Sequence, residues 1–296
     1  MDIGVVLPQL RATPEQAIAA ARRAEGMGAD SVWVIDHVVG FRPELGILEP
    51  WTMLAAVAMI TQRVDIGAMV LCQSFRNPAL LAKMITTLDL VSNGRVRALV
   101  GAGWFETEYK QYGWDFPRAG IRIEQLRDTV RILRGMLTSA NGFTYEGKHH
   151  RVREAVNLPA PAHRIGVEVG GAGDRILRLI AAEGDGWNCP AAALASVDER
   201  IAFLRNECAR RGRSLSDLRL SVQIVCAVGD DNALAHPLLG TFAPELGFVG
   251  SIDSTVDRMR HLVGLGFSGF HCIVPPGPAG LDCLERLVNQ VRPRVT

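Results

Sequence analysis

The chain has 296 residues, of which 48% are hydrophobic, enough to bury a large core. Its 32 basic and 31 acidic residues leave a formal charge of +1, which indicates neither nucleic acid nor a membrane surface as a partner. Six scattered cysteines without a CxxC pair, no signal peptide and no apolar run of membrane-spanning length predict a cytoplasmic protein with reduced thiols, folded as one domain over residues 1–296.

Strand-like and helix-like patterns alternate along the whole chain. Short apolar runs predict eight buried strands, at residues 3–7, 31–35, 64–71, 95–100, 165–169, 184–188, 218–228 and 270–274. A helical pattern follows each strand, beginning near residues 13, 51, 77, 118, 174, 196, 254 and 281. Eight such units over this length predict an α/β fold of the (β/α)8 TIM-barrel type rather than an open doubly wound sheet.

Three stretches interrupt the alternation. Residues 104–117 form an expected loop longer than the ~2–6 residues of a plain connection, which suggests a functional role. Residues 143–152 read as two short strands with a turn, lying over the barrel mouth or its side, and residues 229–250 lack a clear period and are expected to form a lid. We expect insertions at the carboxyl-end face, where barrels of this type build their sites.

The predicted fourth strand runs into three small residues, Gly101, Ala102 and Gly103, where backbone can lie against a ligand. A polar and aromatic cluster follows at 104–109. Within it, Glu106 and Glu108 are alternate residues placed to point in different directions, one toward the mouth and the other toward a nearby Arg or Lys.

Asp36 and His37 directly follow the second predicted strand. An acid beside a titratable imidazole at the carboxyl end of a strand suits proton transfer, or a hydrogen bond to a ligand carbonyl. The alternative is a structural histidine that caps a helix or bonds to a backbone carbonyl, and the spacing favours neither reading.

Residues 170–173, Gly-Gly-Ala-Gly, stand between a predicted strand and a helix. Their amides and the helix dipole suit a phosphate, and a tight turn is the alternative. The sequence is not a GxGxxG fingerprint, so a dinucleotide site is disfavoured.

Four aromatic residues are candidates to frame a planar ring or the substrate, although ordinary core packing explains each one taken alone: Phe41, Trp51, Trp104 and Phe105. Of these we expect Trp51 and Trp104 to bind the substrate. The pair His149-His150 lacks a third ligand at matching spacing, so no metal site is predicted.

Several motifs recur in the order and spacing of a known superfamily. Among them are SVWVIDH at 31–37, LDLVSNGR at 88–95, VGAGWFETEYKQYG at 100–113 and VGGAGDRILRLIAAEGDGWN at 169–188. On these motifs nearly the whole chain resembles the bacterial-luciferase-like superfamily of flavin- and deazaflavin-dependent oxidoreductases. More narrowly, it resembles the branch that uses coenzyme F420.

The resemblance implies a barrel that binds the deazaflavin ring at the carboxyl ends of its strands. Asp36 would contact the edge of the ring, His37 would be the catalytic residue near the substrate, and Met69-Val70 would form a non-prolyl cis peptide behind the ring. Two groups of small residues would also bind the coenzyme, the first beside its ring and the second at its phosphate: Gly101, Ala102 and Gly103, and Gly170, Gly171, Ala172 and Gly173.

The chain departs from the superfamily's sugar-phosphate dehydrogenases, which have a catalytic Glu where this chain has Trp104. The departure argues against their substrate and leaves the general acid unassigned. The predicted function is hydride transfer between coenzyme F420 and a small organic substrate, with His37 as proton donor or acceptor. The alternatives are an FMN-dependent two-component monooxygenase and a non-catalytic flavin-binding-type barrel. A homodimer is expected, paired through the helices at 51–61 and 77–90.

Overall fold

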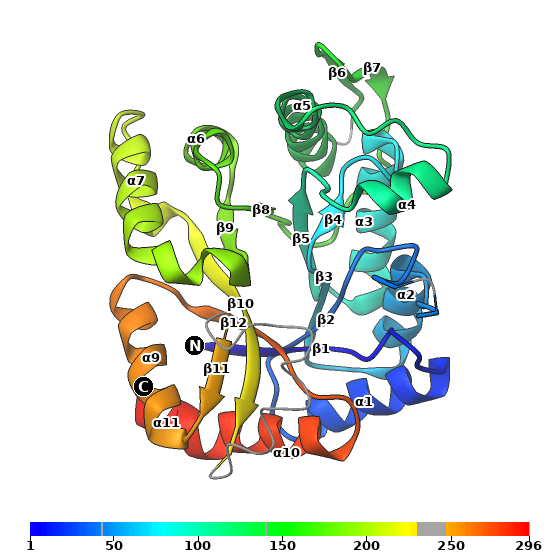
Figure 1. Cartoon of the computed structure of the whole chain (residues 1–296). Helices are drawn as coiled ribbons and strands as arrows, with labels where there is room; N and C mark the ends of the chain where they lie inside the picture. Colours follow the sequence, from blue (N-terminus) through cyan, green and yellow to red (C-terminus); the bar gives the residue numbers. More distant parts are fainter. Residues whose placement is uncertain (43, 140, 230–246, 296) are drawn as a thin grey trace.

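The structure is a computed structural model that describes residues 1–42, 44–139, 141–229 and 247–295. Eight parallel strands close into a barrel surrounded by helices, which confirms the predicted (β/α)8 fold (Figure 1). In order around the barrel, with the last pairing back to the first, they are β1 (Asp2–Val6), β2 (Ser31–Val34), β3 (Asp65–Ala68), β5 (Val96–Gly101), β8 (Val167–Gly170), β9 (Gly186–Cys189), β10 (Arg219–Val228) and β12 (Gly269–Ile273).

The helices on the outside follow the predicted alternation. They are α1 (Pro14–Gly26), α2 (Pro50–Ile60), α3 (Pro78–Ser92), α5 (Ala119–Thr138), α6 (Asp174–Glu183), α7 (Val197–Ala209), α9 (Ile252–Gly264), and α10 (Pro278–Arg286), which continues through Leu287–Val291 into α11 (Arg292–Val295). Thr13 and Gln16 close the capping box expected at the start of α1. Helices α1, α2, α3 and α10 begin with a proline, whose missing N–H forfeits no helical hydrogen bond there.

Several local expectations were wrong. The expected loop at 104–117 contains α4 (Glu106–Gln111), which is favoured by acidic residues in its first turn and by the Glu106–Lys110 ion pair one turn apart. The expected third strand is divided into β3 and β4 (Leu71–Cys72) by a cis peptide between Met69 and Val70, which is the cis bond that the resemblance implies. The expected lid lies mostly outside the described residues, but its end is a strand, β11 (Gly247–Gly250), because the long β10 extends beyond β12 and offers it a pairing edge.

The short strands β6 (Phe143–Glu146) and β7 (Arg151–Ala155) form an antiparallel hairpin. The hairpin lies against α5, where Tyr145 donates a hydrogen bond of 2.8 Å to Asp128. Of the two positions considered for this excursion, the side of the barrel is therefore the correct one.

The barrel interior is filled near the amino ends of its strands. Side chains of this layer are charged and pair with one another, in the ion pairs Arg97–Glu168, Arg97–Asp65 and Arg219–Asp2. The next layer holds Trp33 stacked on His271, with ring centroids 3.9 Å apart. Burial, with Arg97 and Arg219 adding to it, lowers the pKa of His271 well below its ordinary value, so the imidazole is neutral. Because these layers close the lower barrel, a ligand has room only at the carboxyl ends.

All six cysteines are free and buried. Among the residues that the structure describes, no helix combines the length and hydropathy needed to cross a bilayer.

Candidate functional site

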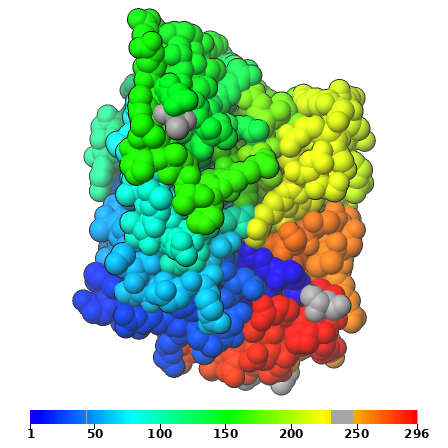
Figure 2. Space-filling view, turned by 180° about the vertical axis from the view of Figure 1, so that it is seen from behind, coloured from blue at the N-terminus to red at the C-terminus, as the bar shows by residue number. Residues whose placement is uncertain are grey.

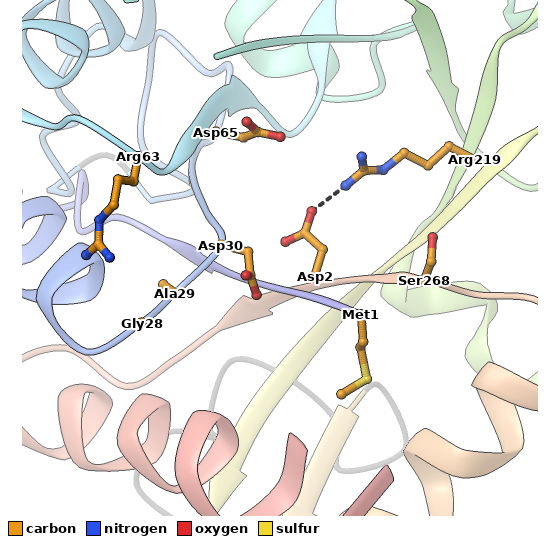
Figure 3. A pocket seen from close by; sticks show the side chains of 9 residues that line it. All are labelled: Met1, Asp2, Gly28, Ala29, Asp30, Arg63, Asp65, Arg219 and Ser268. Carbon is orange, nitrogen blue, oxygen red and sulfur yellow. Dashed lines mark hydrogen bonds and ion pairs between the residues drawn. The ribbon is translucent and has the colours of Figure 1, made fainter. Parts of the chain in front are cut away.

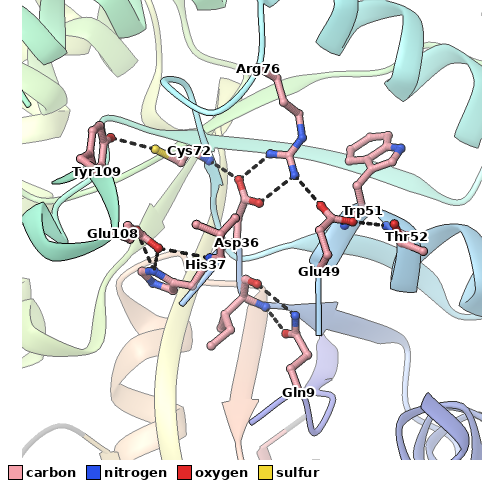
Figure 4. A network of polar contacts seen from close by, with 12 residues as sticks. Gln9, Asp36, His37, Glu49, Trp51, Thr52, Cys72, Arg76, Glu108 and Tyr109 are labelled. Carbon is pink, nitrogen blue, oxygen red and sulfur yellow. Dashed lines mark hydrogen bonds and ion pairs between the residues drawn. The ribbon is translucent and has the colours of Figure 1, made fainter. Parts of the chain in front are cut away.

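Polar side chains converge at the carboxyl ends of β2, β4 and β5 (Figure 4). Asp36 and His37 follow β2, Cys72 ends β4, Arg76 lies in the segment after β4, and Glu108 lies in α4 after β5. Parallel strands bring these segments to one rim of the barrel although they are far apart in the sequence.

The carboxylate of Asp36 is buried and bonded through both oxygens. Arg76 donates from Nη1 to Oδ2 (2.8 Å) and from Nη2 to Oδ1 (3.0 Å), and the Cys72 amide donates to Oδ2 (2.6 Å). Burial raises the pKa of Asp36, against the opposing effects of the Arg76 charge and the Cys72 amide. Oδ1 accepts only one of these bonds and can accept a second, so the direct contact between Asp36 and a ligand that the resemblance implies stays a prediction.

Arg76 joins two segments of the rim. Its Nη2 also donates to Glu49 (3.1 Å), and its guanidinium carbon lies 5.8 Å from the centroid of the Trp51 ring. Burial acts to lower the pKa of Arg76, but the carboxylates of Asp36 and Glu49 outweigh it and raise the pKa, so the side chain stays charged. Trp51 thus has a cation over its ring, and its expected contact with substrate stays a prediction.

His37 is held by a buried carboxylate. Its Nδ1 lies 3.0 and 3.1 Å from the two carboxylate oxygens of Glu108, which also accepts the Val38 amide at 3.2 Å. Glu108 is only 1% exposed. This arrangement fixes Nδ1–H as the donor to Glu108, and Nε2 makes no hydrogen bond with any described residue. Glu106 pairs instead with Lys110 at 2.8 Å, so the two glutamates divide as the sequence suggested.

Three aromatic rings, which we call the aromatic box (Phe41, Trp104 and Phe105), surround the His37 ring. Their centroids lie 4.9, 5.6 and 6.0 Å from the imidazole, each presented edge to face. The box rings also contact one another at 5.3 to 6.0 Å. Trp104 is 65% exposed, which places a large apolar surface at the rim of the mouth.

Two glycines leave room for the side chain of Val70. A Cβ on Gly170 would stand 2.7 Å from Val70 Cγ1, and one on Gly101 would collide with Val70 Cγ2. At Gly103 φ is +75°, and a Cβ would collide with the Tyr109 hydroxyl, which contacts Cys72 Sγ at 3.0 Å. Burial raises the pKa of Cys72 to about 11, so its thiol is not a ready nucleophile. Gly101 and Gly170 therefore pack against Val70, and Gly103 packs against Tyr109 and Cys72.

The turn at 170–173 leads into α6. Its Gly171 has φ of +128°, which favours glycine, and a Cβ on Gly173 would meet open space. Gly173 is the N-cap of α6 and offers no side chain to the helix, and within the described part of the chain the amides of Ala172 and Gly173 have no acceptor. Free amides at a helix N-terminus suit an anion such as a phosphate.

Sequence reasoning missed the role of Arg76 and left Glu108 as one of two options. The sequence did contain a signal for Arg76: a charged residue that directly follows a buried strand lies at the barrel rim, where it is expected to form an ion pair. Gln9 was also missed: its side chain bonds the amide and carbonyl of Ile35 and thereby fixes the backbone directly before Asp36.

Two surface depressions lie elsewhere on the molecule. One, of about 510 Å³, opens at the amino ends of the strands, where Asp2 pairs with Arg219 (Figure 3). The other, of about 350 Å³, lies between α5 and α6. Its lining includes five arginines and two glutamates, among which Arg131 pairs with Glu183 and Arg175 with Glu124. We place the candidate site at the mouth, because it combines an imidazole nitrogen oriented by a buried carboxylate with the aromatic box. The described residues contain no group of three or more His, Cys, Asp and Glu that could hold a metal.

The chain was compared with known proteins. Over 179 residues it is 35% identical to an F420-dependent glucose-6-phosphate dehydrogenase of Amycolatopsis mediterranei, a match covering 60% of this chain and 53%, about half, of that protein. Among solved structures, an F420-dependent secondary alcohol dehydrogenase in complex with an F420-acetone adduct matches with a TM-score of 0.87 and 22% identity, over 100% of this chain and 99% of that one. A monooxygenase from Streptomyces bottropensis matches with a TM-score of 0.82 and 17% identity over the whole of both chains.

At these identities the structural matches show the shared fold. The profile of the luciferase-like monooxygenase family matches residues 1–260, most of the chain. The strands, the cis peptide and the rim residues described above all lie within that range or close to its end. The chain therefore belongs to the luciferase-like monooxygenase family.

Proposed function

We propose that the chain is an oxidoreductase that transfers hydride between coenzyme F420 and a small organic substrate. The observation that carries the proposal is the His37–Glu108 pair, in which a buried carboxylate orients one imidazole nitrogen and leaves the other open at the mouth. The Amycolatopsis relative and the alcohol dehydrogenase structure, both named as F420-dependent, support this choice of coenzyme.

The mouth has the features that a deazaflavin with a phosphate requires. The side chain of Val70, which lies over Gly101 and Gly170, offers an apolar wall for the ring. The free amides of the 170–173 turn suit the phosphate. When bound there, coenzyme F420 supplies an acceptor or donor of hydride.

The residues of the chain would orient the substrate and move the proton. Nε2 of His37 accepts the hydroxyl proton when an alcohol is oxidised and returns it when a carbonyl is reduced. Glu108 holds the tautomer that leaves Nε2 free and stabilises the imidazolium that forms. The aromatic box places apolar surface beside this proton transfer.

An FMN-dependent two-component monooxygenase is the second candidate. The description of the family and the monooxygenase structure from Streptomyces bottropensis favour it. The same wall and the same free amides fit FMN, whose ring shape and phosphate resemble those of the deazaflavin.

The test is a titration of the purified protein with coenzyme F420 and, separately, with FMN, followed by Trp fluorescence and by thermal unfolding. We expect F420 to quench the fluorescence and to stabilise the fold, by about 2.7 kcal/mol at 100-fold over its dissociation constant. Stabilisation by FMN and not by F420 would transfer the assignment to the monooxygenase, and no response to either would favour a non-catalytic barrel.

We further propose that the protein works in the cytoplasm, which its six free cysteines support.

We also propose a homodimer paired through α2 and α3, which lie in the light blue to cyan part of the face in Figure 2. Four large apolar side chains of these helices are exposed: Met59, Leu80, Leu90 and Val91. Light scattering should give twice the mass of the chain, and Met59→Glu with Leu80→Glu should halve it. A monomeric parent protein would refute the pairing.

A further inference from the structure

The surroundings of the open nitrogen of His37 restrict what kind of molecule can react there. With Nδ1 committed to Glu108, a substrate oxygen has to approach Nε2 past the aromatic box. The rings of Phe41, Trp104 and Phe105 already pack around the imidazole, so the groups next to the reacting oxygen meet carbon surface. Aromatic surface favours apolar substituents and offers no hydrogen bond to a sugar hydroxyl, except through the indole N–H.

The charges at the mouth work against an anionic substrate. Arg76 is shared between two carboxylates, Asp36 and Glu49, and Lys110 is paired with Glu106. Glu108, the carboxylate nearest the imidazole, has no Arg or Lys among its ion-pair partners in the described chain. A phosphate brought next to His37 would therefore meet the like charge of Glu108.

Residues 230–246 contain no Lys or Arg in their sequence. Arg42 follows Phe41 and is exposed, which makes it the cation nearest to the box along the chain. Recognition of a phosphate through Arg42 is therefore the competing arrangement.

We infer that the substrate is a neutral alcohol or ketone with an apolar body, and that Trp104 is the residue that selects it; this inference rests on the oxidoreductase function proposed above. The apolar part of the substrate packs on Trp104 and Phe41, while its oxygen meets Nε2 of His37. The chain thus differs in substrate from its relative named as a glucose-6-phosphate dehydrogenase.

The first experiment measures kcat/KM with F420 for 2-propanol, cyclohexanol and glucose 6-phosphate, in the wild type and in three variants. In the wild type, cyclohexanol should be the best substrate and glucose 6-phosphate the poorest. Trp104→Ala should lower kcat/KM for cyclohexanol about 10- to 200-fold, mainly through KM, and should affect 2-propanol less because 2-propanol offers less surface to pack. Trp104→Phe should lose less of the kcat/KM for cyclohexanol than Trp104→Ala. Val156→Ala is the control: it truncates another well-exposed apolar residue (58%), and its kcat/KM values should equal those of the wild type.

The result that overturns the inference is efficient turnover of glucose 6-phosphate, above all if Arg42→Ala abolishes it. An unchanged preference in Trp104→Ala would overturn the role of Trp104.

A second measurement keeps this test separate from that of the proposed function. Binding of cyclohexanone and of glucose 6-phosphate is measured by calorimetry in the protein without coenzyme and, where it binds, in the presence of FMN. We expect heat of binding only for cyclohexanone, and its loss in Trp104→Ala. If F420 does not bind but this pattern holds, the proposed function fails and the substrate class stands. If F420 binds and neither cyclohexanol nor cyclohexanone is used or bound, the substrate class fails and the proposed function stands.

Discussion

Replacing His37 with Ala is expected to lower turnover with F420 and substrate by ~10²- to 10⁴-fold, the usual contribution of a positioned acid or base. The affinity for F420 should stay close to that of the wild type, because the proposed coenzyme contacts lie on Val70 and on the turn at 170–173. Single-turnover kinetics and a fluorescence titration of the same sample separate the two quantities. Turnover equal to that of the wild type would remove His37 from the mechanism.

Glu108→Gln is the matched variant. The amide keeps the size of the side chain, but it accepts hydrogen bonds through only one oxygen and donates them through its NH2 group. It can therefore donate to Nδ1 and permit the tautomer of His37 that carries its proton on Nε2. We expect a loss of turnover in the same direction as for His37→Ala and a changed pH profile of kcat/KM. The double variant His37→Ala/Glu108→Gln should be little worse than His37→Ala alone, since Glu108 acts through His37. Additive losses would show that Glu108 has an independent role.

Replacing Arg76 with Met is expected to lower the free energy of unfolding by about 3–5 kcal/mol, because it leaves the buried carboxylate of Asp36 without a cation. The pKa of Asp36 is already raised by burial, and loss of Arg76 raises it further. Between the unfolded-state pKa of Asp36 and its raised folded-state pKa, the folded variant then binds more protons than its unfolded state. The stability of the variant should therefore rise as the pH is lowered through this interval, which urea unfolding at several pH values measures.

Two further variants interpret this result. Arg153→Met removes an exposed cation that pairs with Glu146 at 3.9 Å, and should change stability by less than about 1 kcal/mol. Arg76→Met/Asp36→Leu removes both charges and should regain much of the lost stability, since an apolar pair of similar size often replaces a buried ion pair without loss. A double variant as unstable as Arg76→Met would mean that packing of the Arg76 stem, and not the unpaired charge, explains the loss.

The fold was predictable because its signals are local. Strands buried on both faces are continuous apolar runs, and several helices begin at a recognisable cap such as Thr13 or Asn77. The same reasoning failed where the chain changes direction for reasons outside the local pattern, as at β11, which exists because β10 offers a free edge.

The site was predictable only in part, because its contacts are long-range. His37 and Glu108 are 71 residues apart, and Glu106 carries the same carboxylate two residues earlier. The helical phase of α4 decides between them: two residues turn about 200° around a helix, so one glutamate faces solvent and the other faces the barrel. Since that segment was expected to be a loop, this phase was not available from the sequence. The aromatic box has the same difficulty, because Phe41 and Trp104 follow different strands.

Val70 fills the space above both Gly101 and Gly170, so the allowed residues at these three positions depend on one another. A methyl group added at either glycine is tolerable only if the side chain at position 70 becomes smaller in the same molecule. Single-site libraries would therefore find the two glycines intolerant of change. A library that varies the three positions jointly would reach combinations that single substitutions at the glycines miss, and with them different shapes for this wall of the mouth.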